Sequence, residues 1–76
     1  MNVRLSQLRE REGGIVVNIE GGPRARSKLT AIGVVPGARV RVLKINPYGP
    51  IIIAVGNARF AMGRGLAEKV IVRRVM

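Results

Sequence analysis

The chain has 76 residues and a formal net charge of +10, from 14 Lys and Arg against 4 acidic residues, and it contains neither Cys nor His. This length allows one domain covering residues 1–76, and the composition excludes disulfides and sites built on thiolate or imidazole ligands. No apolar stretch reaches the about 20 residues of a membrane-spanning helix, and the start is no signal peptide. We therefore expect a cytoplasmic protein without membrane insertion.

The first half of the chain predicts a strand and then a helix. Residues 5–8 are typical of a short helical turn, and residues 15–19 alternate apolar and polar side chains with the period of a half-buried strand. Pro23 suits the first position of a helix, because its missing N–H has no partner there. Apolar side chains then recur at helical spacing until Gly33, which is placed to end the helix in a left-handed conformation.

The second half predicts strands joined by short turns. Pro36 and Gly37 occupy the positions that a tight turn favours. In the strand that follows, the alternation slips at Val42 and Leu43, which indicates a bulge or a sharp bend. Gly56 and Asn57 suit a two-residue hairpin. The strands expected after the helix cover residues 39–45, 51–55, 58–62 and 69–75, with a short connection over 63–68.

These elements predict a mostly β fold of about five strands, with one short α-helix between the first strand and the second. The sheet is too small for a two-layer sandwich. A closed or nearly closed barrel removes exposed strand edges and suits a chain of this length.

Catalysis and metal binding find little support in the residue types. The commonest general base, His, and the best nucleophile, Cys, are both missing. Glu10 and Glu12 lie close together, but in a charged stretch that is more typical of a solvated segment. We expect no enzyme, no metal site and no cofactor.

Two basic groups are candidates for binding. Gly21 and Gly22 lead into a helix that carries Arg26, and the free N–H groups of a helix start together with cations favour an anion. The alternative for this segment is a solvated polar helix face. Arg39 and Arg41 share one face of their strand, and Arg59 is placed to lie alongside.

The net charge leaves a second function open, that of a small β-barrel that binds nucleic acid. Such barrels usually add aromatic side chains for base stacking. Of the two aromatic residues, only Tyr48 lies in a predicted turn.

Almost the whole chain resembles the ferrous iron transport protein A (FeoA) family. The order and spacing of several segments carry the resemblance: the opening 5–8 with Gly13, the run 28–37, Val40 and Val42, Pro47, Gly49 and Pro50, Gly56, Ala61 and Met62, Ala67, and the strand at 70–72. Because the chain starts at Met1 and has no room for a DNA-reading helix-turn-helix, we expect the free-standing, single-domain form.

The resemblance implies an SH3-like barrel and a cytosolic accessory protein of ferrous iron transport. Its partner would be the cytosolic G-protein domain of the iron transporter, and the protein itself a monomer or a weak homo-oligomer. Exposed residues around the helix and its exit turn are the candidates for partner contact. Arg24 and Lys28 would pair with acidic groups, and Val35 and Tyr48 would supply apolar area.

Overall fold

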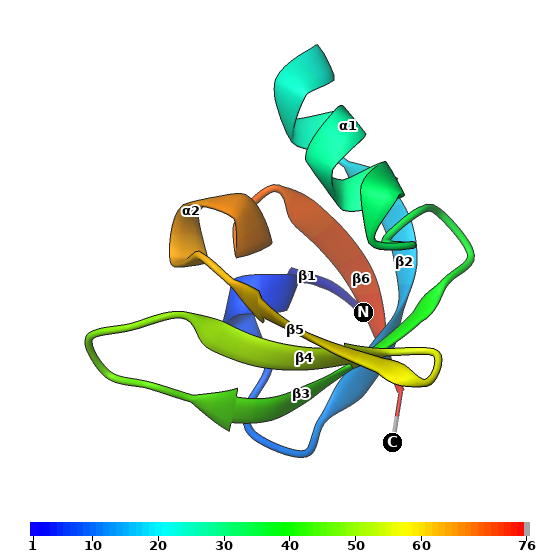
Figure 1. Ribbon diagram of the computed structural model, residues 1–76. Coiled ribbons are helices and arrows are strands. Elements are labelled where there is room, and N and C mark those ends of the chain that lie inside the picture. Colours follow the sequence, from blue (N-terminus) through cyan, green and yellow to red (C-terminus); the bar gives the residue numbers. More distant parts are fainter. Residues whose placement is uncertain (76) are drawn as a thin grey trace.

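The computed structural model describes residues 1–75, which form one antiparallel sheet, two α-helices and a 3₁₀ helix at Leu5–Gln7. The strands are β1 (Asn2–Arg4), β2 (Gly13–Ile19), β3 (Arg39–Ile45), β4 (Ile51–Val55), β5 (Ala58–Met62) and β6 (Val70–Val75). The helices are α1 (Pro23–Ala31) and α2 (Arg64–Ala67). The strand order in the sheet is β1-β6-β2-β3-β4-β5, so the first and the last strand lie side by side (Figure 1).

The predicted mostly β fold is confirmed, with α1 between the first two long strands. The described residues form six strands, one more than the sequence predicted. The additional strand is β1, which has only three residues and is too short to show an alternating pattern. It forms because it pairs with the far end of the chain, with Asn2 opposite Arg73 and Arg4 opposite Ile71.

The core of the barrel is apolar throughout the described residues, and no polar or charged side chain is buried in it. Alternate positions of the strands supply most of it, as the period of a strand requires. The buried residues are Leu5, Leu8, Val16, Ile19, Leu29, Val34, Val40, Val42, Ile51, Ile53, Met62, Ala67, Val70 and Val72.

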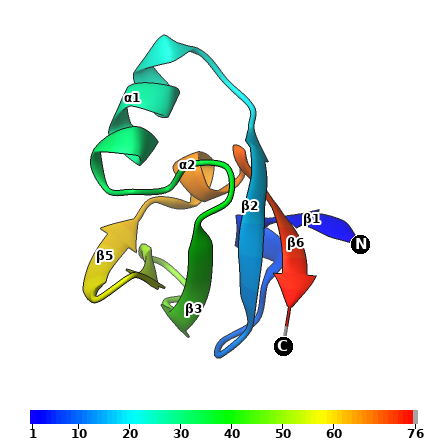
Figure 2. The same cartoon turned by 90° about the vertical axis from the view of Figure 1, so that its right-hand side faces the viewer.

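Two irregularities bend the sheet around this core (Figure 2). The register of β2 against β6 shifts between Val16 and Asn18, and that of β3 against β4 shifts between Val42 and Lys44. A bulge inserts a residue on one strand, which bends that strand and increases its twist. The second shift confirms the bulge that the sequence predicted at Val42 and Leu43.

The C-terminal end of α1 is anchored by its backbone and by its apolar contact. Gly33 N–H donates to Thr30 O over 3.0 Å and Val34 N–H donates to Leu29 O over 2.9 Å, while Gly33 has a φ of 86°. These are the two hydrogen bonds of a Schellman motif, and the left-handed Gly33 confirms the predicted helix end. Leu29 and Val34 are both fully buried. The rest of α1 is half-buried or exposed, and the helix projects from the barrel (Figures 1 and 2).

The remaining predicted turns are also present. Ala38 N–H donates to Val35 O over 2.9 Å, and Gly37 has a φ of 92°, as the tight turn requires. Gly56 and Asn57 form the two-residue connection between β4 and β5. Within residues 1–75, no helix is long and apolar enough to cross a lipid bilayer.

Candidate functional site

A shallow groove of about 450 Å³ lies between the first turns of α1 and the short helix α2. We call it the α1–α2 groove. Its lining residues are Gly22, Pro23, Arg24, Ala25, Lys28, Gly65, Leu66 and Lys69. Pro23, Ala25 and Leu66 supply apolar surface, and the three charged lining residues are all cations. The groove therefore combines apolar surface with positive charge.

The α1 wall of the groove follows from the local sequence. Gly22 is the N-cap, and Pro23 occupies the first helical position, as predicted. Arg24 and Lys28 are four residues apart, so they lie on one face of the helix. Both side chains are exposed. This face of α1 points into the groove, because Arg24, Ala25 and Lys28 all line it.

The opposite wall comes from the end of the chain and is held in place by backbone hydrogen bonds. Lys69 N–H donates to Leu66 O over 3.0 Å, which ends α2 beside the start of β6. Glu20 N–H donates to Lys69 O over 2.7 Å. Because Glu20 directly follows β2 and precedes α1 by only a few residues, this bond sets the two walls side by side.

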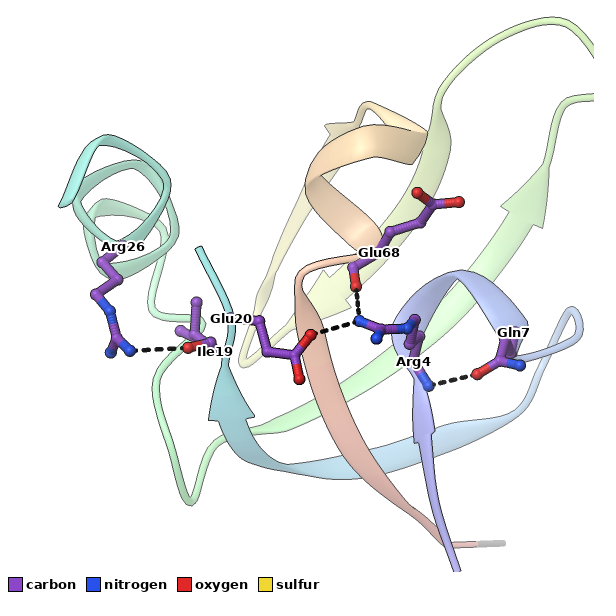
Figure 3. A network of polar contacts seen from close by, with 6 residues as sticks. All are labelled: Arg4, Gln7, Ile19, Glu20, Arg26 and Glu68. Carbon is purple, nitrogen blue, oxygen red and sulfur yellow. Dashed lines mark hydrogen bonds and ion pairs between the residues drawn. The ribbon is translucent and has the colours of Figure 1, made fainter. Parts of the chain in front are cut away.

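A second hollow of about 510 Å³ adjoins the groove and shares Gly65 and Lys69 with it. Its other lining residues are Arg4, Glu20, Gly21 and Glu68. Arg4 Nη1 lies 2.8 Å from Glu20 Oε1 and 2.6 Å from Glu68 O, so one guanidinium joins β1, the end of β2 and the end of α2 (Figure 3). The two glutamates balance the cations here. The groove beside it keeps its positive charge.

The groove has the chemistry of a binding surface. Its lining offers ammonium and guanidinium groups, apolar carbons and backbone, but no carboxylate, hydroxyl or thiol that could act as a base or a nucleophile. Among residues 1–75, no three acidic, His or Cys side chains gather into a set that could hold a metal ion.

The structure brings together two of the four residues predicted for partner contact. Arg24 and Lys28 line the groove. Val35 is half-buried in the turn before β3, whereas Tyr48 is fully exposed in the turn after it. The seven residues of β3 separate them by roughly 20 Å, at about 3.3 Å per residue. One continuous patch containing all four residues is therefore absent from the described structure.

The residues predicted for anion binding are divided as well. Gly22 lines the groove, and Gly21 lines the adjoining hollow. Arg26 lies on another side of α1, and its Nη2 donates a hydrogen bond of 2.9 Å to Ile19 O (Figure 3). In this structure its guanidinium therefore links α1 to the end of β2. Binding of an anion at this helix start stays a prediction.

Sequence patterns did not reveal the α2 wall. Leu66 is one apolar residue in a short polar segment, and Lys69 is one cation among many, so neither stands out in the chain. They line the groove because a hydrogen bond joins Glu20 and Lys69, which are far apart in sequence. Only a short connection was predicted over residues 63–68, and the structure forms α2 within it.

Comparison with known proteins identifies relatives across nearly the full chain. Residues 3–74 match the family model described as FeoA domain. A protein from Methanocaldococcus jannaschii with the provisional name Fe(2+) transport protein A is 37% identical over 68 residues, which cover 90% of this chain and 82% of the relative.

Solved structures agree with the fold. A crystal structure of an iron uptake regulatory protein, FeoA, superposes with a TM-score of 0.94 at 53% identity and covers 99% of this chain and 100% of that chain. The FeoA of Stenotrophomonas maltophilia, solved with zinc and described as an SH3 domain protein, superposes with a TM-score of 0.81 at 26% identity and covers 93% and 89% of the two chains. The predicted SH3-like barrel is thereby confirmed.

Proposed function

This chain belongs to the FeoA domain family, and from that premise we propose that it is a cytoplasmic accessory protein of ferrous iron transport. In this proposal it regulates the transporter by docking on its cytosolic G-protein domain, with the α1–α2 groove as the contact surface. It transfers no chemical group and carries no iron itself.

The names of the relatives support the transport role. One is named for Fe(2+) transport and another for regulation of iron uptake, and the Stenotrophomonas protein is described in connection with activation of ferrous iron transport. The residues present in this chain suit an accessory protein. The groove offers surface for contact with another protein, and its lining supplies no oxygen, nitrogen or sulfur ligands of the kinds that ferrous iron prefers.

The observation that carries the docking proposal is that apolar residues and three cations line the same groove. Protein interfaces commonly place apolar area at the centre of the contact and polar groups around it. Arg24 and Lys28 stand on a helix that projects from the barrel, where another protein can reach them. A complementary partner surface presents an apolar side chain over Leu66, with carboxylates facing the cations.

The mixed character of the groove sets the expected salt dependence. Exposed charge pairs are screened at physiological ionic strength, where the Debye length is about 8 Å. The apolar contact is not screened. Docking through this groove should therefore weaken with added salt and still persist at moderate salt, in contrast to binding that rests on charge alone.

An NMR titration of isotope-labelled protein with the isolated G-protein domain tests the proposal at physiological salt and without lipid. We expect saturable shifts of the amides of Arg24, Lys28, Leu66 and Lys69. Replacing Lys28 by Glu should weaken docking by about tenfold or more, because it removes an attraction and adds a repulsion of similar size across the interface.

Arg59→Glu is the matched control, since it makes the same charge change on β5, away from the groove. It should dock like the unmodified protein. Equal losses in both variants would show that net charge alone drives association. The complete absence of shifts at saturating partner concentration would rule out this G-protein domain as the partner.

A further inference from the structure

A row of arginines on the outer face of the sheet lies apart from the α1–α2 groove. On β3, Arg39 and Arg41 are exposed, whereas Val40 and Val42 between and beside them are buried. The two arginines therefore project from the outer face of the barrel. Being two residues apart on one strand, they are separated by about 7 Å.

The strand register adds an arginine on each side. Arg41 pairs with Ala54 on β4, and Ala54 pairs with Arg59 on β5. In the other direction, Arg39 pairs with Ile15 on β2, and Ile15 pairs with Arg73 on β6. Directly opposed residues share a face of a sheet. We call the surface formed by Arg39, Arg41, Arg59 and Arg73 the arginine face.

The acidic side chains are occupied elsewhere. Glu10 Oε2 accepts a hydrogen bond from Ile45 N–H, Glu12 Oε1 accepts one from Arg9 N–H, and Glu20 is paired with Arg4. Glu68 lines the hollow beside the groove. Within residues 1–75, no ion pair joins any of the four arginines of this face to a carboxylate.

Small and apolar residues lie between the arginines, and the surface is hollowed there. One shallow hollow is lined by Gly13, Val40 and Val75 beside Arg39 and Arg41, and another by Ala54 and Gly56 on their other flank. Val17, further along β2, is 43% exposed. The face thus offers exposed guanidinium groups in an apolar setting, with Arg41 held in part by a hydrogen bond of 3.2 Å from its Nε to Arg11 O.

We propose that the arginine face binds the anionic surface of a lipid bilayer. Guanidinium groups form bidentate hydrogen bonds with phosphate, and basic residues gain from the negative potential of anionic lipids. Val17 and Ile15 suit the boundary between lipid headgroups and acyl chains, which accepts shallow apolar contacts.

A single-stranded nucleic acid is a poorer fit to the same surface. Such strands are usually held by aromatic rings on which the bases stack. Phe60 lies opposite Ile53, a buried residue, and so points toward the core side of β5, while Tyr48 is in the turn beyond the far end of β3. The described part of the arginine face therefore has no aromatic ring.

The choice of a membrane also rests on the proposed function, because the proposed partner is part of a membrane transporter. The geometry permits both contacts at once. The arginine face lies beside Ile15 in the first half of β2, whereas the groove begins at Gly22, beyond the other end of that strand. A molecule resting on the bilayer through its arginines thus leaves the groove accessible to a protein partner.

Co-sedimentation with vesicles of phosphatidylcholine containing about 30% phosphatidylglycerol tests the proposal, using the protein alone at physiological salt. We expect binding to these vesicles and none to pure phosphatidylcholine. A basic residue near an anionic membrane contributes about fivefold in partitioning, so Arg39→Gln with Arg41→Gln should weaken binding by about 25-fold.

Arg9→Gln with Arg64→Gln is the matched control. It removes the same charge from exposed positions elsewhere on the chain, and its effect should stay below about threefold. Thermal unfolding of both double variants checks that they are folded. Absent vesicle binding, or equal losses in the two double variants, would overturn the proposal.

Competition with a single-stranded RNA supplies the remaining test. Tighter binding to this RNA than to anionic vesicles, lost in the Arg39 and Arg41 variant, would identify nucleic acid as the occupant and overturn the membrane proposal. Lipid is absent from the titration with the G-protein domain, and the G-protein domain is absent here. Absent vesicle binding therefore contradicts the membrane proposal alone, and absent amide shifts contradict the docking proposal alone.

Discussion

The guanidinium of Arg26 donates a hydrogen bond of 2.9 Å to the carbonyl oxygen of Ile19, the last residue of β2. This bond ties the projecting part of α1 back to the sheet (Figure 3). The C-terminal end of the helix is already held by buried Leu29. The bond between Arg26 and Ile19 thus helps to fix the angle of the helix and with it one wall of the α1–α2 groove.

Replacing Arg26 by Ala should loosen the first turns of α1. One hydrogen bond of this kind contributes about 0.5–1.5 kcal/mol, so the global free energy of unfolding should fall only slightly. The larger effect should be local, as faster amide hydrogen exchange in the first turns. Arg24→Ala is the control, since Arg24 makes no side-chain hydrogen bond within residues 1–75. Unchanged exchange in the Arg26 variant would show that packing alone orients the helix.

Replacing Gly33 by Ala should destabilise the fold by about 1 kcal/mol, because a side chain is strained in the left-handed conformation of this residue. Its surroundings have room, with Val55 Cγ1 3.5 Å from the position of an added Cβ, so the backbone conformation causes the loss. Urea unfolding measures it. Gly65→Ala within α2 is the comparison, where an added Cβ meets nothing within 4 Å, and it should leave stability equal or higher. An equal loss in both variants would contradict this account.

Replacing Leu29 by Ala should be the most damaging single change in α1. Leu29 is fully buried and attaches the helix to the core. Truncation of a buried Leu costs about 2–5 kcal/mol, a large part of the stability of a small domain. The exposed neighbour Thr30 serves as control, and its change to Ala should alter the free energy of unfolding by less than about 0.5 kcal/mol. A loss below about 1 kcal/mol in the Leu29 variant would mean that α1 folds independently of the core.

The ion pair between Arg4 and Glu20 should contribute little to stability despite its short distance of 2.8 Å. The two side chains are 45% and 51% exposed, so solvent screens their attraction. A double-mutant cycle with Arg4→Gln and Glu20→Gln should give a coupling energy below about 1 kcal/mol that declines with added salt. A coupling above about 2 kcal/mol that is independent of salt would contradict this expectation.

Local patterns in the sequence predicted much of the fold. The alternation in β2 to β6, the end of α1 at Gly33 and the bulge after Val42 each depend on a few neighbouring residues. Gly13 and Gly14 instead lay outside the strand predicted over residues 15–19, and they belong to β2. A Cβ on Gly14 would lie 2.9 Å from Arg73 O, so glycine here permits the close approach of β6. That requirement comes from the other end of the chain.

The residues of the candidate site were likewise predicted only in part from local sequence patterns. The face of α1 with Arg24 and Lys28 followed from helical spacing, and the residues of the arginine face on β3 followed from strand alternation. Val35 and Tyr48 were assigned to the same patch because both adjoin turns. The seven residues of β3 separate them, and the strand predicted over 39–45 already implied this separation.

By itself the sequence determined the element types, the apolar core positions and the excess of positive charge, since these follow from residue chemistry and short-range periodicity. The sequence also predicted that Arg59 lies alongside Arg39 and Arg41, and only the tertiary structure added Arg73 to that face. Antiparallel pairing brings Arg73, Arg39 and Arg59 onto one face, and the bond from Glu20 to Lys69 sets α1 beside α2. Strand register and groove walls depend on contacts between distant segments, which form only when the chain closes around its core.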